Sequence, residues 1–414
     1  MVPWFNGESG IGGLQSDIAE SGAFFLNERV CVGCSREFHA RVDGVRLQAT
    51  PMERRAFAFV CIDHSTTSRH RPMRRIPCVC DGVPTADSLL GPVAGPFALS
   101  ALAKNCPDEP EAAAIAWTMS PVSEFYADRC VLVTGATGFL GKVLVEKLLW
   151  SASDIGTIYL IVRPQNGLDS KQRLDKMLQS NLFDRVRSKY PDRFNKLVAI
   201  DGNLMEPELA LNQPDMHRLC DDVSVVFHCA ATVKFDEALR ISVEMNVLGT
   251  QRLIALCHKM RNLVSVVHAS TAYANCDRPR IVESVYPPPV QPSKLIDAME
   301  WMNDDMIKSL TPHLLGRRPN TYTLTKALAE VQLVEDSGHL PVVIVRPSII
   351  GAVWKEPIPG WMDNLNGATG IFAAVGKGVL TNMCGSTSAT ADIIPVDIVS
   401  NLLIVAAWQR AVNK

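Results

Sequence analysis

The stretch Cys130-Val-Leu-Val-Thr-Gly-Ala-Thr-Gly-Phe-Leu-Gly141 decides the fold of this chain. Its first five residues are an almost continuous apolar run that ends at Thr134, which predicts a short buried strand. Three glycines follow, and after them apolar and polar residues recur at the spacing that predicts a helix over 138–149. A strand, a glycine-rich turn and a helix in this order predict a unit that binds a dinucleotide.

Each of the three glycines has an expected task. Gly135 allows the tight turn, Gly138 lets the backbone approach a pyrophosphate, and Gly141 lets the helix pack closely on the strand. The N-terminus of the helix then faces the phosphates. A purely structural glycine turn is the alternative, and the context of strand and helix argues against it. The expected cofactor contacts here are Thr134, Gly135, Thr137, Gly138, Phe139, Leu140 and Gly141.

Strand-like and helix-like segments alternate beyond this unit. This order predicts an α/β fold, a doubly wound and mostly parallel Rossmann sheet with helices on both faces. The expected strands are 130–134, 157–162, 197–200, 223–228, 264–269 and 342–345. The expected helices are 138–149, 171–189, 241–260, 322–335 and 402–408.

The second expected strand ends in Leu160-Ile-Val-Arg163. Proteins that bind NAD usually carry an Asp or Glu at this point, which hydrogen-bonds the ribose 2′-hydroxyl. Arg163, with Lys171 and Arg173 just beyond it, suits the 2′-phosphate of NADP instead. We therefore predict NADPH as the cofactor, with a solvated surface arginine as the alternative interpretation of Arg163.

Other strand ends supply further candidates for the cofactor site. Asn203 and Leu204 follow the third strand, where we expect them to face the adenine. Ala230 and Ala231 follow the fourth strand, and their small side chains let the backbone pass close to the cofactor. The preceding pair His228-Cys229 invites a catalytic interpretation, but we interpret it as the end of a buried strand.

A catalytic pair is predicted at the start of the helix over 322–335. Tyr322 and Lys326 are four residues apart, so they share one face of that helix. A tyrosine pKa near 10 is too high for proton transfer at neutral pH, and a neighbouring ammonium group is expected to lower it. Thr271 follows an apolar strand and is expected to donate a hydrogen bond to a developing oxyanion.

Several stretches resemble the extended short-chain dehydrogenase/reductase superfamily and, more narrowly, the fatty acyl-CoA reductases that form alcohols. The resemblance covers about Met119 to the end of the chain. It separates the chain from sugar-nucleotide epimerases through the segment around Trp354. The stretches are Val133–Lys142, Phe227–Val233, Ser270–Tyr273, Tyr286–Pro289, Asn320–Lys326, Val345–Ile349, Trp354–Trp361 and Gly367–Gly378.

The resemblance implies NADPH-dependent reduction of a long-chain fatty acyl-CoA to a primary alcohol through a bound aldehyde, feeding ether-lipid or wax synthesis. It makes Tyr322 the general acid and Lys326 its partner on the nicotinamide ribose. Thr271 becomes the hydroxyl donor, with Ser270 as the alternative. It also places Asn246 on a helix that lines the site, and Pro347 and Ser348 beside the nicotinamide.

Two rival functions stay open. One is another extended reductase, or an epimerase that acts on a nucleotide sugar. The insertion Pro287–Met306 is apolar enough to cover an acyl chain, but a surface amphipathic helix explains it nearly as well. The other rival is an inactive fragment that binds NADPH without turnover. NADPH oxidation that depends on a thioester would separate these functions.

Composition narrows the classes of partner and compartment. The chain has 414 residues, 47% of them hydrophobic, and 41 basic against 43 acidic side chains give a net charge of −2, which disfavours a nucleic-acid binder. The 12 cysteines follow no zinc or disulfide pattern, so we expect an intracellular protein with reduced thiols and no metal. The resemblance implies membrane association at the cytosolic face of peroxisomes, although we expect no membrane anchor in this chain.

Residues 1–118 differ in composition and periodicity from residues 119–414, the expected NADP-binding reductase domain. They contain ten arginines against one lysine, Lys104, and no sustained strand or helix period. We expect a largely disordered extension that suits a translated upstream region or an erroneous gene model. The family's helical C-terminal domain is not expected here, so the last helix should expose an apolar patch.

Overall fold

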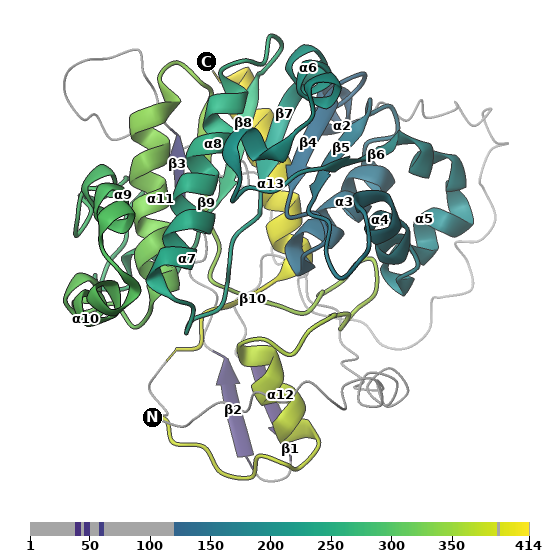
Figure 1. Cartoon of the computed structure of the whole chain (residues 1–414). Coiled ribbons are helices and arrows are strands. Elements are labelled where there is room, and N and C mark those ends of the chain that lie inside the picture. Colours follow the sequence, from purple (N-terminus) through teal and green to yellow (C-terminus); the bar gives the residue numbers. More distant parts are fainter. Residues whose placement is uncertain (1–37, 43–44, 50–57, 62–119, 387–389, 414) are drawn as a thin grey trace, which may run out of the picture. The chain divides into compact units, whose positions relative to one another are not determined.

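The computed structural model describes residues 38–42, 45–49, 58–61, 120–386 and 390–413. Its centre is a sheet with parallel strands in the order β9-β8-β7-β4-β5-β6 (Figure 1). The chain runs outward from β4 in one direction and from β7 in the other, which is the order of a doubly wound Rossmann sheet and confirms the predicted fold class. The strands are β4 (Cys130–Thr134), β5 (Ile158–Val162), β6 (Leu197–Asp201), β7 (Val223–His228), β8 (Ser265–Ala269) and β9 (Val342–Arg346).

Successive residues of each strand enter cores on opposite faces of the sheet. In β4, for example, Val131 and Val133 point to one core and Leu132 to the other. Both faces therefore need cover, which explains why the strands are apolar runs without alternation. The helices of the first face are α3 (Phe139–Ser151), α4 (Ser170–Leu178) and α13 (Val396–Val412). Those of the second face are α6 (Gln213–Asp222), α8 (Gly249–Cys257) and α11 (Thr321–Ser337).

Two predicted helices are interrupted in the structure. The helix expected over 171–189 ends at Leu178, and Ser180 then caps a new turn by accepting the Leu182 N–H at 3.3 Å. The helix expected over 241–260 contains a π-helical turn over Glu244–Leu248. The remaining short elements of this domain include the segments that follow the first break. They are α2 (Pro121–Phe125), η2 (Asn181–Phe183), α5 (Asp184–Lys189), η3 (Pro191–Lys196), η4 (Pro207–Ala210), α7 (Leu239–Val243) and η6 (Ala272–Asn275).

The last helix, α13, is longer and better covered than the sequence predicted. It begins at Val396, and its residues Leu403 and Ala407 are fully buried against α3 and the strands β8 and β9. The Tyr126 hydroxyl, at the other end of the domain's sequence, donates to the Ile404 carbonyl at 2.8 Å. The expected apolar patch is therefore wrong for most of this helix, because its apolar positions cover the sheet.

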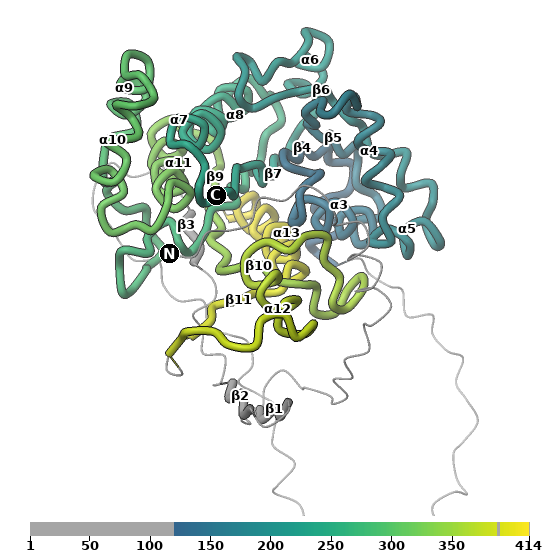
Figure 2. Tube along the Cα trace, turned by 60° about the horizontal axis from the view of Figure 1, so that its bottom comes forward, coloured from purple at the N-terminus to yellow at the C-terminus, as the bar shows by residue number. Residues whose placement is uncertain are grey.

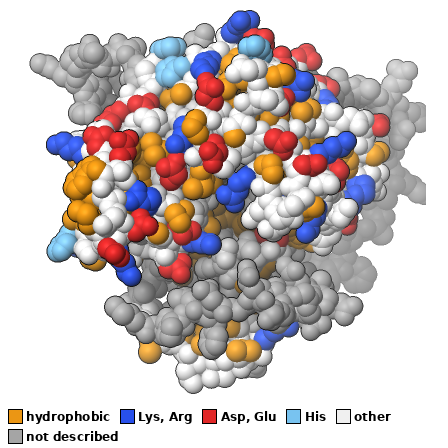
Figure 3. Space-filling view, in the orientation of Figure 1, with side chains coloured by type: hydrophobic (Ala, Val, Ile, Leu, Met, Phe, Trp, Pro, Cys, Tyr) orange, Lys and Arg blue, Asp and Glu red, His pale blue; other side chains and the backbone are white. Residues whose placement is uncertain are grey.

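The predicted insertion forms two helices, α9 (Pro292–Trp301) and α10 (Asp304–Leu315). Leu295 and Met299 are buried against α7 and α11, as an amphipathic surface helix requires. Apolar side chains also gather on the outside of these helices, where Trp301 and Met306 are exposed (Figure 3).

The segment that follows β9 contains the remaining elements of this part of the chain. Strand β10 (Ile349–Gly351) pairs in parallel with β11 (Ile393–Pro395), and α12 (Ala368–Gly376) lies between them in the sequence (Figure 2). Several apolar side chains in and beside α12 are exposed, among them Phe372, Val379 and Met383.

Three short strands lie within residues 1–118, where the sequence predicted no regular element. β1 (Phe38–Val42) and β2 (Val45–Ala49) form an antiparallel hairpin, and β3 (Ala58–Cys61) pairs with β9 in the antiparallel direction. The signal missed was Asp43-Gly44, because this dipeptide between alternating apolar residues is typical of a two-residue hairpin. The predicted disorder of the other residues of 1–118 lies outside the described residues.

Candidate active site

The glycine turn is packed too closely to accept side chains. Gly135 has a positive φ of 73°, and a Cβ there would lie 2.7 Å from the Ala230 nitrogen. A Cβ on Gly141 would lie 2.2 Å from the Gly135 carbonyl oxygen. Gly135 is therefore required by contact as well as by conformation, and Gly141 by contact alone. Ala230 lies against the turn through its backbone, and its contact with the cofactor stays a prediction.

The start of α3 fits the diphosphate of a dinucleotide. Gly138 caps the helix without any side-chain hydrogen bond, so its first N–H groups remain for a ligand. Thr137 and Leu140 are half-buried at this turn. The ring of Phe139 stacks on Trp361 with centroids 5.8 Å apart, so Phe139 faces this turn mainly through its backbone.

Two arginines lie together beside this turn. Arg163 follows β5 and is exposed, and its carbonyl accepts a hydrogen bond from Arg173. The Arg173 guanidinium also contacts the Thr137 hydroxyl at 3.3 Å. Burial and then the charge of Arg163 lower the pKa of Arg173. The structure thus adds Arg173, which the sequence placed only nearby, to the cations at this edge of the cofactor site.

The residues after β6 only partly match their predicted role. Leu204 is buried in the core, where a Cβ on Gly249 would lie 3.2 Å from it. The Asn203 side chain accepts the Met205 N–H at 3.2 Å and is half-buried. Because the Leu204 side chain packs inward, it does not face an adenine, and the contact of Asn203 with the adenine stays a prediction.

A chain of hydrogen bonds connects the end of β4 to the end of β7. The Thr134 hydroxyl lies 2.8 Å from Nδ1 of His228, and Nε2 of His228 lies 3.0 Å from the Thr250 hydroxyl. Burial, and then the charge of Lys326, lower the pKa of His228 to about 3. Burial raises the pKa of Cys229 to about 12. Neither side chain is therefore charged at neutral pH, in agreement with the structural interpretation of this pair.

Thr271 and Tyr322 meet at the carboxyl edge of the sheet. Burial raises the pKa of Tyr322 to about 12, and a hydrogen bond with the Thr271 side chain opposes this increase. The ring of Phe235 lies 5.7 Å from the Tyr322 ring, and Phe235 is itself exposed. No role was predicted for Phe235, because a single aromatic residue in a polar loop carries no pattern.

Lys326 is almost completely buried one helical turn after Tyr322. Its Nζ donates to the Ala269 carbonyl at 2.8 Å and lies 3.4 Å from Nε2 of His268. Burial lowers the pKa of Lys326 to about 8, while the charge of Glu330 raises it. The prediction that Lys326 lowers the pKa of Tyr322 is wrong. The Lys326 ammonium group points to the Ala269 carbonyl at the end of β8 instead.

Asn246 lies in the π-helical turn, a local irregularity that often occurs at functional sites. Its Oδ1 accepts the Thr232 N–H at 2.9 Å, and its Nδ2 donates to the Thr325 hydroxyl at 3.0 Å. Asn246 therefore joins the loop after β7, which also contains the half-buried Ala231, to α11, the helix of Tyr322 and Lys326.

The residues after β9 join the Thr271 segment. The Pro347 carbonyl accepts the Ala272 N–H at 2.9 Å, and Ser348 is half-buried beside it. The structure therefore brings the predicted nicotinamide-flanking residues to the same strand edge as Thr271.

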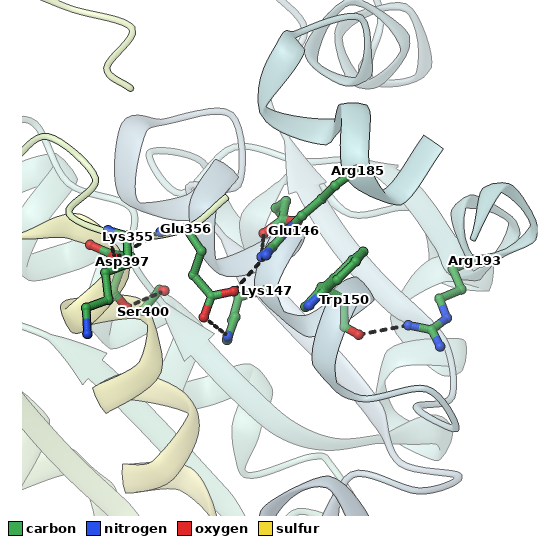
Figure 4. Close-up of polar contacts among 9 residues, drawn as sticks. All are labelled: Glu146, Lys147, Trp150, Arg185, Arg193, Lys355, Glu356, Asp397 and Ser400. Atoms are coloured by element: carbon green, nitrogen blue, oxygen red, sulfur yellow. Dashed lines mark hydrogen bonds and ion pairs between the residues drawn. The ribbon is translucent and has the colours of Figure 1, made fainter. Parts of the chain in front are cut away.

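Ion pairs fix the segment Trp354–Trp361 to the first face of the sheet (Figure 4). The carboxylate of Glu356 pairs with Lys147 at 2.9 Å and with Arg185 at 2.6 Å. Arg185 also binds the fully buried Glu146, with Nε 2.6 Å from Oε1. The Asp397 carboxylate accepts backbone N–H groups of this segment (Figure 4). The network explains how a segment without regular structure is held in place.

Within the described part of the chain, no group of three or more His, Cys, Asp or Glu side chains is placed to hold a metal ion. No helix among these residues is long and apolar enough to cross a membrane. The cysteines that raised the question of zinc in residues 1–118 have side chains outside the described residues.

The parallel sheet and the glycine turn under α3 define a Rossmann fold of the kind that binds a nicotinamide dinucleotide, and the predicted catalytic residues Thr271, Tyr322 and Lys326 lie together at the carboxyl edge of its sheet. More narrowly, the chain belongs to the NAD-binding family described as male sterility protein, whose model matches residues 133–403.

Similar proteins and solved structures agree with this assignment. Fatty acyl-CoA reductase 1 of Xenopus laevis and that of Homo sapiens are each 50% identical to the chain over 296 residues, which is 72% of this chain. The chain spans 58% of the length of these curated relatives. The reductase domain of a nonribosomal peptide synthetase from Mycobacterium tuberculosis is similar in structure, with a TM-score of 0.50 and 26% identity, covering 71% of this chain and 65% of that one.

Proposed function

We propose that the chain reduces long-chain fatty acyl-CoA to a primary alcohol with NADPH, through a bound aldehyde. The observation that carries the proposal is the meeting of Thr271, Tyr322 and Lys326 at the carboxyl edge of the sheet, the edge at which the glycine turn also lies. The identity to fatty acyl-CoA reductases supports a thioester as the substrate. Two arginines near Thr137 support NADPH as the cofactor.

The protein's own residues supply hydrogen bonds and a proton. Tyr322, with a pKa of about 12, is protonated at neutral pH and donates to the carbonyl oxygen as negative charge develops on it. Thr271 adds a second hydroxyl at the same oxygen. Lys326 holds the nicotinamide ribose in this proposal, and Arg163 and Arg173 hold the 2′-phosphate. NADPH, when bound, supplies one hydride for the thioester and a second for the aldehyde.

The resemblance to fatty acyl-CoA reductases implies the order of the bond changes. Hydride addition to the thioester carbon and protonation of its oxygen give a hemithioacetal, which loses the CoA thiol and leaves the aldehyde. Hydride addition to the aldehyde carbon and a proton from Tyr322 then give the alcohol. Each acyl-CoA therefore consumes two NADPH and two protons and yields one alcohol and one CoA.

The direct test is to incubate the chain with NADPH and palmitoyl-CoA. We expect NADPH oxidation that depends on the thioester, hexadecanol as the product, and a ratio of two NADPH oxidised per CoA released. A ratio of one with accumulated aldehyde would contradict the second reduction. Turnover of a nucleotide sugar without a thioester would favour the epimerase alternative, and tight NADPH binding with no turnover would favour the inactive fragment.

The resemblance to fatty acyl-CoA reductases supports two cellular parts of the proposal. We expect the alcohol to enter ether-lipid or wax synthesis, and the protein to be at the cytosolic face of the peroxisomal membrane. Fractionation of cells that express the chain, with protease protection of isolated peroxisomes, tests this location. Recovery in another organelle would contradict it.

A further inference from the structure

Three consecutive residues at the end of β8 contact three residues of α11. The contacts occur in register, because Tyr322, Lys326 and Glu330 follow one another at intervals of four and so share one face of the helix. The pairs are Thr271 with Tyr322, Ala269 with Lys326 and Ser270 with Glu330. Two of these pairs belong to the proposed catalytic group, and the third does not.

The third pair belongs to a buried ion pair at the end of β9. Glu330 and Arg346 are 1% and 0% exposed at their side chains. Their contact is bidentate, with Nε 2.8 Å from Oε1 and Nη2 2.6 Å from Oε2. The Ser270 hydroxyl donates to the same Oε1 at 2.5 Å. Such geometry offsets the large cost of burying two charges.

Arg346 extends this network to a loop outside the sheet. Its Nη1 donates to the Val282 carbonyl at 3.3 Å and its Nη2 to the Ser284 carbonyl at 2.9 Å. One arginine therefore connects β9, α11 and the loop that follows the Thr271 segment. An ion pair that served only packing would not need a hydrogen bond with Ser270, the residue between Ala269 and Thr271.

The surroundings of Lys326 give Glu330 an electrostatic role as well. From β8 and β7 Lys326 faces His268 and His228, whose pKa values are lowered by burial, and beside them the thiol of Cys229. From its own helix it faces the carboxylate of Glu330. The charge of Glu330 raises the pKa of Lys326 against the effect of burial.

We propose that the Glu330–Arg346 ion pair is a positioning device for the reductase site, which holds Tyr322 and Lys326 in register with Thr271 and supplies the counter-charge for the Lys326 ammonium group. The inference rests on the proposed function, since it assigns to Lys326 the task of holding the cofactor ribose. The pair itself touches neither substrate nor cofactor.

The test measures NADPH affinity against pH in Glu330→Gln. The amide keeps the size of the side chain but removes its charge, so Lys326 should lose its proton at lower pH. We expect the alkaline decrease in NADPH affinity to move down by roughly one pH unit or more, the usual effect of one nearby charge. Glu330→Asp keeps the charge and should leave the alkaline decrease near its wild-type position, while the shorter side chain lowers kcat.

Glu146→Gln is the matched control. Glu146 is as buried as Glu330 and is paired with Arg185 in the network of Figure 4. It lies on α3, far from Lys326 in the sequence. Its amide variant should lose a similar amount of thermal stability and keep the wild-type pH dependence of NADPH binding. An alkaline decrease at the same pH in Glu330→Gln and Glu146→Gln would overturn the inference.

Two further measurements keep the inference separate from folding and from turnover. If Glu330→Gln does not fold, Ser270→Ala removes only the hydroxyl contact and should lower kcat without moving the pH dependence. Unchanged kcat in that variant would overturn the positioning role. NADPH binding without palmitoyl-CoA turnover would contradict the proposed function, while the pH dependence of binding would still decide the role of Glu330.

Discussion

The Thr134 hydroxyl lies 2.8 Å from Nδ1 of His228, although the two residues are 94 positions apart in the sequence. The same hydroxyl accepts the Ala230 N–H at 3.3 Å. Thr134 is the last residue before the glycine turn, so these contacts fix the turn against the end of β7. The glycine turn is therefore held by two neighbouring strands, β4 and β7, and changes on either strand should affect its position.

Gly141→Ala should abolish NADPH binding and lower the melting temperature. The new Cβ would lie 2.2 Å from the Gly135 carbonyl oxygen, so α3 would have to move away from the turn. Differential scanning calorimetry with and without NADPH measures both effects. The control is Gly376→Ala in α12, because no atom lies within 4 Å of a Cβ at that position. Unchanged NADPH binding in Gly141→Ala would contradict the assignment of the glycine turn to the cofactor site.

Arg173→Ala and Arg163→Ala should each weaken NADPH binding by about 1.5–3 kcal/mol, which is the range for a charge-assisted hydrogen bond. The affinity for NADH should change little, because NADH lacks the 2′-phosphate. Titration calorimetry with both cofactors measures the difference. Arg261→Ala is a suitable control, since Arg261 is 77% exposed and pairs with Asp221 instead. Equal affinity of the unmodified chain for NADPH and NADH would refute the choice of NADPH.

Tyr322→Phe should reduce turnover of palmitoyl-CoA about 10²–10⁴-fold and leave NADPH affinity nearly unchanged. The ring and its contact with Phe235 are kept, while the proton donor is lost. Steady-state kinetics and cofactor titration separate the two effects, with Tyr190→Phe as the control. Turnover equal to that of the unmodified chain would exclude Tyr322 as the acid.

The stability of the ligand-free chain should depend on pH through Lys326. Its pKa is lowered from 10.5 to about 8 in the folded state, so between these values the unfolded chain binds more protons. The free energy of unfolding should therefore rise with pH across this window, by about 3 kcal/mol for this group. Below about pH 8 the full cost of the buried charge remains.

Comparison with Lys326→Met isolates this contribution. Urea unfolding of both chains at several pH values should show the greatest advantage of the Met variant below about pH 8 and a smaller one toward pH 10.5. An advantage that does not vary with pH would mean that the pKa of Lys326 is the same in the folded and the unfolded chain.

The strands were predictable because a parallel sheet buries both faces, and so its strands appear as short apolar runs. The predicted bounds of β4 and β7 agree with the structure, and those of the other parallel strands differ from it by one residue at an end. The glycine turn and the Tyr322–Lys326 spacing were predictable because each is a pattern within one short segment, although their contacts with Ala230, Thr271 and Ala269 are not local.

Features that depend on distant side chains were not predictable in this way. Ser180 interrupts a helical pattern through a cap, and the π-helical turn at Asn246 leaves no trace in apolar spacing. Glu330 and Arg346 belong to different elements, and nothing in either local pattern indicates that they meet. The burial of α13 also depends on a sheet face assembled from the whole domain.

The hydrogen bond between Tyr126 and Ile404 has a consequence for synthesis of the protein on the ribosome. The two residues are 278 positions apart, so α2 must wait for α13 before this contact can form. Until then the first face of β8 and β9 lacks its cover, and the growing polypeptide exposes apolar surface that is prone to aggregation. Assembly of this half of the domain is therefore a late event in the synthesis of the domain, and a nascent chain stalled before Ile404 would depend on chaperones to remain in solution.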